Sequence, residues 1–135
     1  MSNQTMTPDS FYEGVMESGN FRTPAHAQRA TFAVLHTLGF NLSGSTKKDL
    51  AKALPKELAG YLTRGWKLIN IRHKNLPLDE FAKEVALEAG NTDHEVAKVT
   101  SRIIFRQMKS MIDDGLIREV TRDLSPEVSH LWKVA

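Results

Sequence analysis

The sequence predicts an all-α protein, a helical bundle made of two pseudo-two-fold-related repeats of about four helices each. Three observations lead to this fold class. Apolar residues recur at three- and four-residue intervals through most of the chain, which is the period of an amphipathic helix. Threonine-proline pairs at 7–8 and 23–24 have the form of helix start signals. The chain also aligns with itself, without a gap, at one constant offset that places Phe11 on Phe81.

The internal alignment defines the domain organisation. Apolar character agrees at the paired positions Phe11 and Phe81, Val15 and Val85, Ala27 and Ala97, Val34 and Ile104, Leu50 and Val120, and Leu54 and Leu124. Unrelated helices would fall out of phase in the turns between them. A unit of about sixty residues is marginally stable alone, so we expect both copies to share one core. The prediction is a single domain over residues 1–135, with repeat one at about 8–62, a basic linker at 63–77 and repeat two at about 78–132.

The first two helices of each repeat follow from capping signals and apolar spacing. Thr7-Pro8 opens a short helix, and Thr23-Pro24 opens a longer one. The long helix of repeat one presents the apolar stripe Ala27, Ala30, Thr31, Val34, Leu35, Leu38 and Leu42. Its counterpart presents Val96, Val99, Thr100, Ile103, Ile104, Met108, Met111 and Ile112. Basic residues occupy the other side of that second helix, so we expect both stripes to face the core.

Each long helix is followed by a turn and two shorter helices. The turns are at 43–45 and 113–115, and the third helix carries Leu50 and Leu54 in one copy and Leu116 and Val120 in the other. The last helix is expected to begin near Pro55 in repeat one and at Ser125-Pro126 in repeat two, where serine is a good N-cap. The linker is polar and basic, and we expect it to contain an extended piece too short for a sheet.

One set of residues resembles a known family. These residues are Leu54-Pro55-Lys56-Glu57-Leu58, Tyr61-Leu62, Gly65-Trp66 and the run from Phe81 to Val85. They are similar to the bacterial family called domain of unknown function 2267 (DUF2267). The resemblance spans roughly residues 9–132 and implies two helical repeats. In the second copy the proline is moved by one position, to Pro126, which leaves the helix start intact. The resemblance supports the fold, carries over no active-site residue and leaves the function open.

Composition excludes several kinds of protein. There is no cysteine, which excludes disulfides, thiolate metal sites and thiol catalysis. Residues 1–10 have neither the basic patch nor the apolar run of a signal peptide. No stretch of 18 apolar residues is present. We therefore expect a cytoplasmic protein that does not enter a membrane.

Three patterns suggest chemistry but have simpler explanations. Residues 39–46 have the glycine spacing of a phosphate-binding loop, but they lack its lysine and follow a helix, so we expect a turn capped by Ser45 or Thr46. Asp113-Asp114 is expected to cap the next helix. The five histidines, which we expect at the solvated surface, are His26, His36, His73, His94 and His130; none forms an i, i+4 pair. The sequence thus predicts no catalytic residue, metal ligand or cofactor, and a protein that is not an enzyme.

Charge is distributed unevenly along the chain. Residues 47–74 contain eight basic and two acidic residues, a net charge of +6, whereas residues 79–95 carry a net charge of −5. The candidate interaction residues are Lys47, Lys48, Lys52, Lys56, Arg64, Trp66, Lys67, Arg72 and Lys74. They suit a nucleic-acid strand, because cations neutralise phosphates and an indole stacks on a base. In the alternative, which we favour, Trp66 seals the repeat junction while the cations are solvated or pair with the acids of 79–95.

Three functions are compatible with the sequence. We expect a non-enzymatic protein–protein interaction or regulatory module, because catalytic motifs are missing and the repeat offers two similar grooves. The first alternative is a nucleic-acid-binding protein that uses the 47–74 stretch, although the second copy offsets its arginines with acids. The second alternative is a small-ligand binder with a pocket between the repeats. The sequence predicts no oligomeric state.

Overall fold

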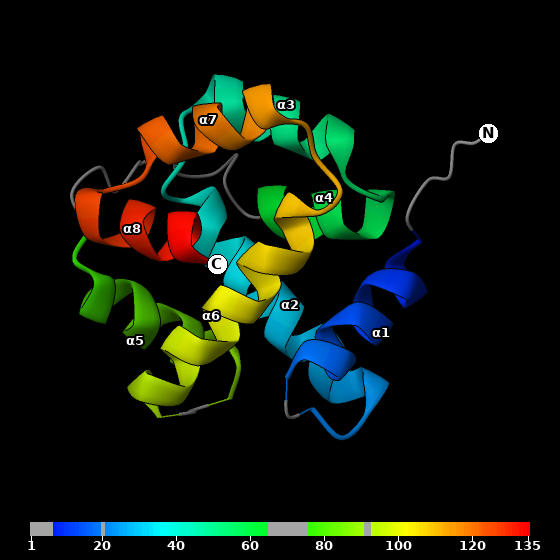
Figure 1. The fold of residues 1–135 in the computed structure, drawn as a ribbon. Helices are drawn as coiled ribbons and strands as arrows, with labels where there is room; N and C mark the ends of the chain where they lie inside the picture. The colour runs from blue at the N-terminus through cyan, green and yellow to red at the C-terminus, as the bar shows by residue number, and fades with distance from the viewer. Residues whose placement is uncertain (1–6, 20, 65–75, 91–92) are drawn as a thin grey trace.

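Eight α-helices fill the described part of the chain, which comprises residues 7–19, 21–64, 76–90 and 93–135 (Figure 1). In the computed structural model the helices are α1 (Pro8–Ser18), α2 (Pro24–Gly39), α3 (Gly44–Ala53), α4 (Lys56–Thr63), α5 (Leu78–Glu88), α6 (His94–Lys109), α7 (Asp114–Asp123) and α8 (Pro126–Val134). No strand occurs within these ranges. The all-α prediction is confirmed. The expected extended piece around Ile69 and Ile71 lies outside the described residues.

Helix boundaries repeat along the chain. The first four helices begin at positions 8, 24, 44 and 56, and the last four begin at positions 78, 94, 114 and 126. Every pair is separated by the offset that places Phe11 on Phe81, and the ends of the first three pairs keep the same separation. The order and lengths of the helices therefore agree with the internal alignment. The two-fold relation of the halves in space stays a prediction.

Local capping explains where the helices begin. Thr7, Thr23, Asp113 and Ser125 each accept a hydrogen bond from the backbone N–H three residues ahead, as their sequence positions predict. The predicted cap of α3 was wrong. Ser43 is the N-cap there, and its Oγ accepts from the N–H of Thr46, because Ser45 and Thr46 already belong to the helix.

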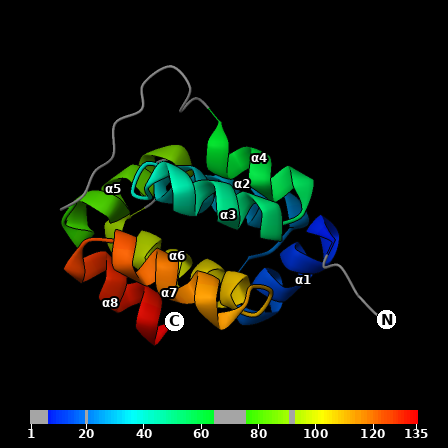
Figure 2. The same ribbon diagram turned by 90° about the horizontal axis from the view of Figure 1, so that it is seen from above.

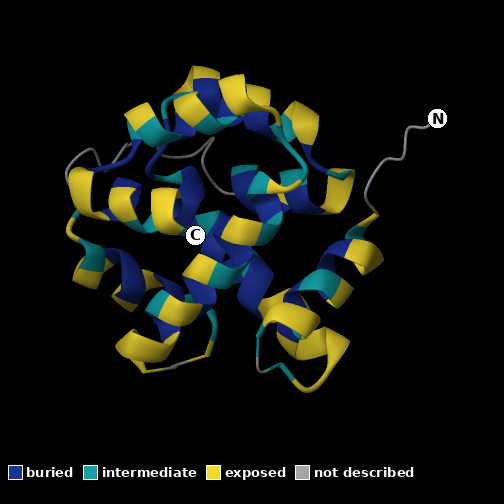
Figure 3. Cartoon of the chain, in the orientation of Figure 1, coloured by how far each residue is buried: buried dark blue, intermediate teal, exposed yellow. Residues whose placement is uncertain are grey.

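The two halves share one core. The long helices α2 and α6 contact each other at the centre of the molecule (Figure 1). Helix α1 packs against both α2 and α6, and α5 packs against both α6 and α2. Helices α3 and α7 lie side by side across one end of the molecule, as the view from above shows (Figure 2). The largest fully buried side chains come from both halves and include Phe11, Leu35, Leu38, Leu50, Phe81, Ile104, Phe105 and Trp132. Figure 3 shows these inward faces as buried and the outer faces as exposed.

Polar contacts also join the halves. Asp123 at the end of α7 accepts hydrogen bonds from the backbone N–H and the Oγ of Ser43, at 2.9 and 2.8 Å. A carboxylate at the N-terminus of α3 also complements the helix dipole. Within the second half, the N-terminus of α5 is capped in a similar way, because Glu127 of α8 accepts from the N–H of Leu78 at 2.6 Å. None of the helices in the described ranges combines the length and apolar character needed to cross a bilayer.

Candidate functional site

The predicted basic residues differ in their exposure to solvent. Lys48, Lys52, Lys56 and Arg64 are exposed. Lys47 is buried, at 4% exposure, and burial lowers the pKa of its ammonium group. This burial makes Lys47 a weaker phosphate contact than the exposed lysines, and its place among the candidate interaction residues stays a prediction. The remaining candidates, Trp66, Lys67, Arg72 and Lys74, lie outside the described residues.

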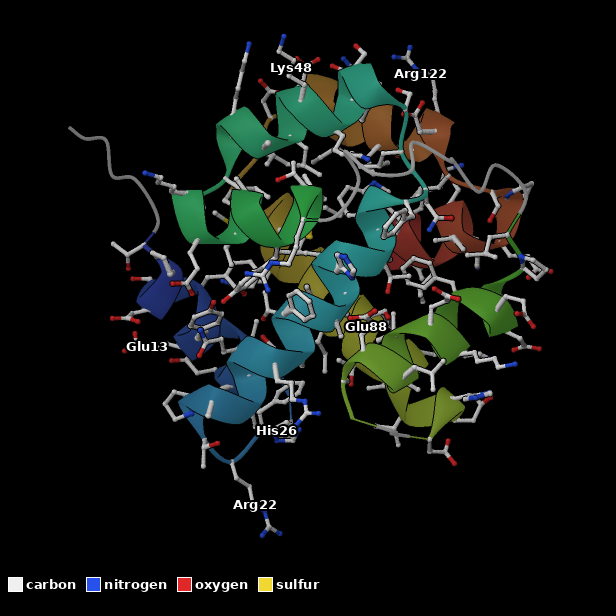
Figure 4. All side chains as sticks on the ribbon, turned by 180° about the vertical axis from the view of Figure 1, so that it is seen from behind. Glu13, Arg22, His26, Lys48, Glu88 and Arg122 are labelled. Atoms are coloured by element: carbon white, nitrogen blue, oxygen red, sulfur yellow. The ribbon has the colours of Figure 1, made fainter. Side chains whose placement is uncertain are left out.

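Acidic residues interrupt the surface of α3 and α7 where the exposed lysines lie. Lys48 of α3 and Arg122 of α7 point into solvent at the same end of the molecule (Figure 4). Asp49 of α3 and Glu119 of α7 lie at this surface as well, and desolvation together with a hydrogen bond to Asp49 raises the pKa of Glu119. The described part of this surface is thus of mixed sign, which is a poor match for a phosphate backbone.

The acids of residues 79–95 have partners in their own half. Lys98 of α6 lies 2.8 Å from Asp79 and 3.1 Å from Glu95, and its hydrogen bond lowers the pKa of Asp79. These two acids therefore pair with α6, and not with the described lysines of the 47–74 stretch as the favoured alternative allowed.

A row of rings follows one side of α2. His36 stacks on Phe32 with centroids 5.1 Å apart and meets the edge of Phe40 at 5.3 Å. Its Nε2 lies 3.0 Å from the backbone oxygen of Arg64, and its Nδ1 lies 3.4 Å from a carboxylate oxygen of Glu88. The prediction of a solvated His36 was wrong, because neighbours from α4 and α5 leave its side chain 17% exposed. These contacts join three helices, which is a structural role.

A second polar group ties α1 to α4. Glu57 of α4 accepts hydrogen bonds from the hydroxyl groups of Tyr12 and Tyr61, the latter at 3.0 Å. Gln28 of α2 donates to the Tyr61 oxygen, also at 3.0 Å. Glu127, at the corresponding position of the second half, holds the start of α5 instead. In both halves, therefore, this carboxylate attaches the last helix to the first.

The protein is expected to lose stability as the pH rises above the pKa of an unfolded tyrosine. Replacing Tyr12 with phenylalanine should make this loss smaller. Burial and the hydrogen bonds with Glu57 and Tyr61 raise the pKa of Tyr12 in the folded protein, whereas an unfolded tyrosine ionises near pH 10. Above about pH 10 the folded state keeps a proton that the unfolded state has lost, so stability falls as the pH rises, by up to about 1.4 kcal/mol per pH unit. Urea unfolding of both proteins between about pH 9 and about pH 11 measures this slope. If the free energy of unfolding fell equally steeply with pH in both proteins, the role of Tyr12 would be contradicted.

An apolar cleft opens between the two halves. It has a volume of about 190 Å³ and lies where α2, α5 and α6 meet. Its lining residues are Phe21, His26, Ala30, Val85, Ala89, Val96, Ala97, Val99, Thr100 and Ile103. The first three belong to repeat one and the others to repeat two. Figure 4 shows His26 near the N-terminal end of α2, where its ring meets the edge of Phe21 at 5.0 Å.

The cleft has a buried floor and an exposed apolar wall. Ala30, Val85 and Ala97 are buried at its base. Val96 and Val99 stand in the wall and are 50% and 59% exposed. Exposed side chains of this kind, grouped around a hollow, are typical of a binding site more than of an ordinary surface.

The expectation that Val96 and Val99 face the core was wrong. The apolar stripe of α6 is wider than the face that α2 and α5 cover, so its outer edge stays in solvent. A signal was present in the sequence. In the internal alignment, these valines pair with His26 and Arg29, which are polar. When a position is apolar in one repeat and polar in the other, we infer that the corresponding surfaces of the two repeats have different functions.

Two further findings concern metal sites and known proteins. The residues that the structure describes contain no group of three or more His, Asp or Glu side chains that could hold a metal ion. The family model for DUF2267, described as an uncharacterized conserved protein, matches residues 8–131. A search of the curated proteins finds no match to the chain.

Proposed function

The chain belongs to the DUF2267 family, and we propose that it is a non-enzymatic protein-binding module whose cleft receives one apolar side chain of a partner protein. The open cleft between the repeats carries this proposal. Its lining includes the buried apolar residues Ala30, Val85 and Ala97, and its wall presents Val96 and Val99 to solvent. Covering that wall removes apolar surface from water, which is the main driving force for association.

The size of the cleft favours a side chain over a metabolite. Pockets for small-molecule ligands usually measure about 300–1,000 Å³. At about 190 Å³ this cleft is nearer to a cavity of about 150 Å³ that holds one benzene molecule. A leucine, isoleucine or phenylalanine side chain would fill it and contribute about 1.5–3 kcal/mol. The rest of the affinity would come from contacts outside the cleft, which a partner protein supplies better than a small ligand does.

The nucleic-acid alternative has weaker support. A strand would need a continuous positive surface. Of the candidate residues, Lys47 is buried, and Asp49 and Glu119 accompany the exposed lysines at the α3–α7 surface.

Selection from a displayed library of random peptides tests the proposal. We expect the selected peptides to share one large apolar residue and to lose about tenfold in affinity when Val99 is replaced with glutamine, since the contact of one valine is worth about 1.5 kcal/mol. Leu87→Gln is the matched control, because Leu87 is equally exposed, at 63%, but does not line the cleft. Both variants change only the surface and should fold normally.

Two outcomes would overturn the proposal. One is a selection that yields no binding peptide. The other is a set of peptides whose affinity falls equally with Val99→Gln and Leu87→Gln, which would place binding elsewhere or make it nonspecific.

A further inference from the structure

We infer that the partner is a second copy of this chain, and that two copies pair face to face at the cleft about a two-fold axis. This inference rests on the proposed function and adds the identity of the partner. Two observations carry it. The two sides of the cleft have opposite charge, and exposed apolar side chains stand in its wall.

The side of the cleft formed by repeat one is basic. Residues 21–39, which include α2, contain no Asp or Glu. Arg22 and Arg29 are exposed there, and Figure 4 shows Arg22 near the start of α2. The nearest acid before this segment is Glu17, which stands two residues after the buried Val15. Two residues turn a helix by a little more than half a turn, so Glu17 lies on the outer side of α1.

The side of the cleft formed by repeat two is acidic. Residues 84–96 run from α5 into α6 and contain neither Lys nor Arg. Their four acids, which give the segment a net charge of −4, are Glu84, Glu88, Asp93 and Glu95. All of these except Glu88, which is half-buried, are exposed. This side of the cleft therefore carries a charge opposite to that of repeat one.

Two cations of the same chain offset part of the acidic charge. Lys98 lies 3.1 Å from Glu95, but it also lies 2.8 Å from Asp79, so one ammonium group serves two carboxylates. Arg29 extends toward the acidic side, because a Cβ atom added to Gly90 would lie 2.7 Å from its Nη2. The acids still outnumber these cations, and the face stays basic on one side and acidic on the other.

A face of this kind is complementary to itself. In a pair related by a two-fold axis, each copy contributes the same surface to the interface. If the axis runs along the cleft, the basic side of each copy faces the acidic side of the other. The attraction then forms twice. A wholly acidic or wholly basic partner would instead be attracted to one side of the cleft and repelled by the other.

The exposed apolar side chains fit the same arrangement. The large apolar side chains that are exposed in the described ranges are Leu87, Val96, Val99 and Val134. Because the axis would pass along the cleft, a side chain that enters the partner's cleft must lie beside its own. Among the four, only Val96 and Val99 line the cleft. These valines of one copy would thus cover the hollow of the other, and the same contact would form in reverse.

Self-association over a range of protein concentrations tests the inference. By sedimentation equilibrium we expect a dimer with a Kd between about 1 and about 100 μM, since a contact centred on one small hollow lies at the low end of interface sizes. In NMR spectra, dilution should shift the amide signals of Val96 and Val99. Val99→Gln should weaken the dimer at least tenfold, because this valine takes part twice. Leu87→Gln is the matched control and should leave the dimer unchanged, since Leu87 does not line the cleft.

Two charge-reversed variants assign the pairing to the two sides of the cleft. The variant Arg22→Glu, Arg29→Glu has acids on both sides, and the variant Glu84→Lys, Glu95→Lys has more cations than acids among these four positions. At about 20 mM salt, where exposed charges are weakly screened, each variant alone should dimerise at least tenfold more weakly than the unchanged protein. An equimolar mixture should associate as tightly as the unchanged protein does, because unlike charges again face each other on both sides.

A third double variant is the control for the charge change. Arg118→Glu, Arg122→Glu makes the same change of charge at exposed positions of α7. Figure 4 shows Arg122 at the opposite end of the molecule from Arg22. This variant should dimerise like the unchanged protein. Circular dichroism checks that every variant keeps its helices, and recovery of association on mixing excludes misfolding as the cause of its loss.

The outcomes separate the inference from the proposed function. A protein that stays monomeric at about 1 mM, a concentration far above the expected Kd, overturns the inference. The binding module still stands if selected peptides bind at the cleft of that monomer, and both ideas fall if no peptide binds. A dimer that is unaffected by Val99→Gln, or charge-reversed variants that do not associate on mixing, would place the pairing at another surface and would also overturn the inference.

Discussion

Gly39→Ala is expected to destabilise the protein by about 3 kcal/mol or more. Gly39 is the last residue of α2, and a Cβ atom there would lie 2.2 Å from the backbone oxygen of Leu62 in α4. A backbone atom cannot move aside as a flexible side chain can, so the two helices would have to separate. That movement would open the core on both sides of the contact. Urea unfolding measures the loss as a lower midpoint at an unchanged slope.

Gly60→Ala is the matched control for this prediction. Gly60 lies inside α4, close in sequence to the same contact, and an added Cβ atom there would meet nothing within 4 Å. Alanine should therefore stabilise the protein by about 0.5–1 kcal/mol, because it restricts the unfolded chain and favours the helix. If both substitutions changed the stability by the same amount, the close approach of α2 and α4 would be wrong.

Phe11→Ala and Phe81→Ala are each expected to cost about 3–5 kcal/mol. The two phenylalanines occupy equivalent positions in α1 and α5, and both are fully buried. Each deletion leaves a cavity whose walls come from both halves, because α1 packs on α2 and α6 while α5 packs on α6 and α2. Leu87→Ala, at an exposed site of α5, should change the stability by less than about 0.5 kcal/mol.

The same two variants test whether the halves fold as one unit. A shared core predicts one cooperative unfolding transition for each variant, at a lower denaturant concentration than for the unchanged protein. Helical content and tryptophan fluorescence should report the same midpoint. If Phe11→Ala unfolded the first half while the second stayed folded, the transition would have two steps. That result would contradict the single domain predicted over residues 1–135.

Sequence reasoning was most accurate for the helices. Caps at Thr7, Thr23 and Ser125 depend on a side chain and a backbone N–H three residues away, so the information is local. The constant offset of the internal alignment then predicted where the helices of the second half begin. The cap of α3 was misplaced because serine and threonine occur at several nearby positions there, and each of them is a suitable N-cap.

The sequence pointed to two candidate sites. Charge density pointed to residues 47–74, and the second alternative was a pocket between the repeats, which is where the cleft between α2, α5 and α6 lies. The residues that line this cleft were not predicted. No local pattern distinguishes a valine that faces the core from one at the edge of a wide apolar stripe. The mismatch of Val96 with His26 and of Val99 with Arg29 in the internal alignment was the available signal.

By itself, the sequence determined the helical class, most of the helix starts and the resemblance to the family, because periodicity and capping act over a few residues. Only the tertiary structure decided which side chains are buried. Lys47 is buried, His36 is enclosed by two neighbouring helices, and Val96 and Val99 remain in solvent. Burial depends on how much of each helix its distant neighbours cover, and that area is set by the packing of the whole chain.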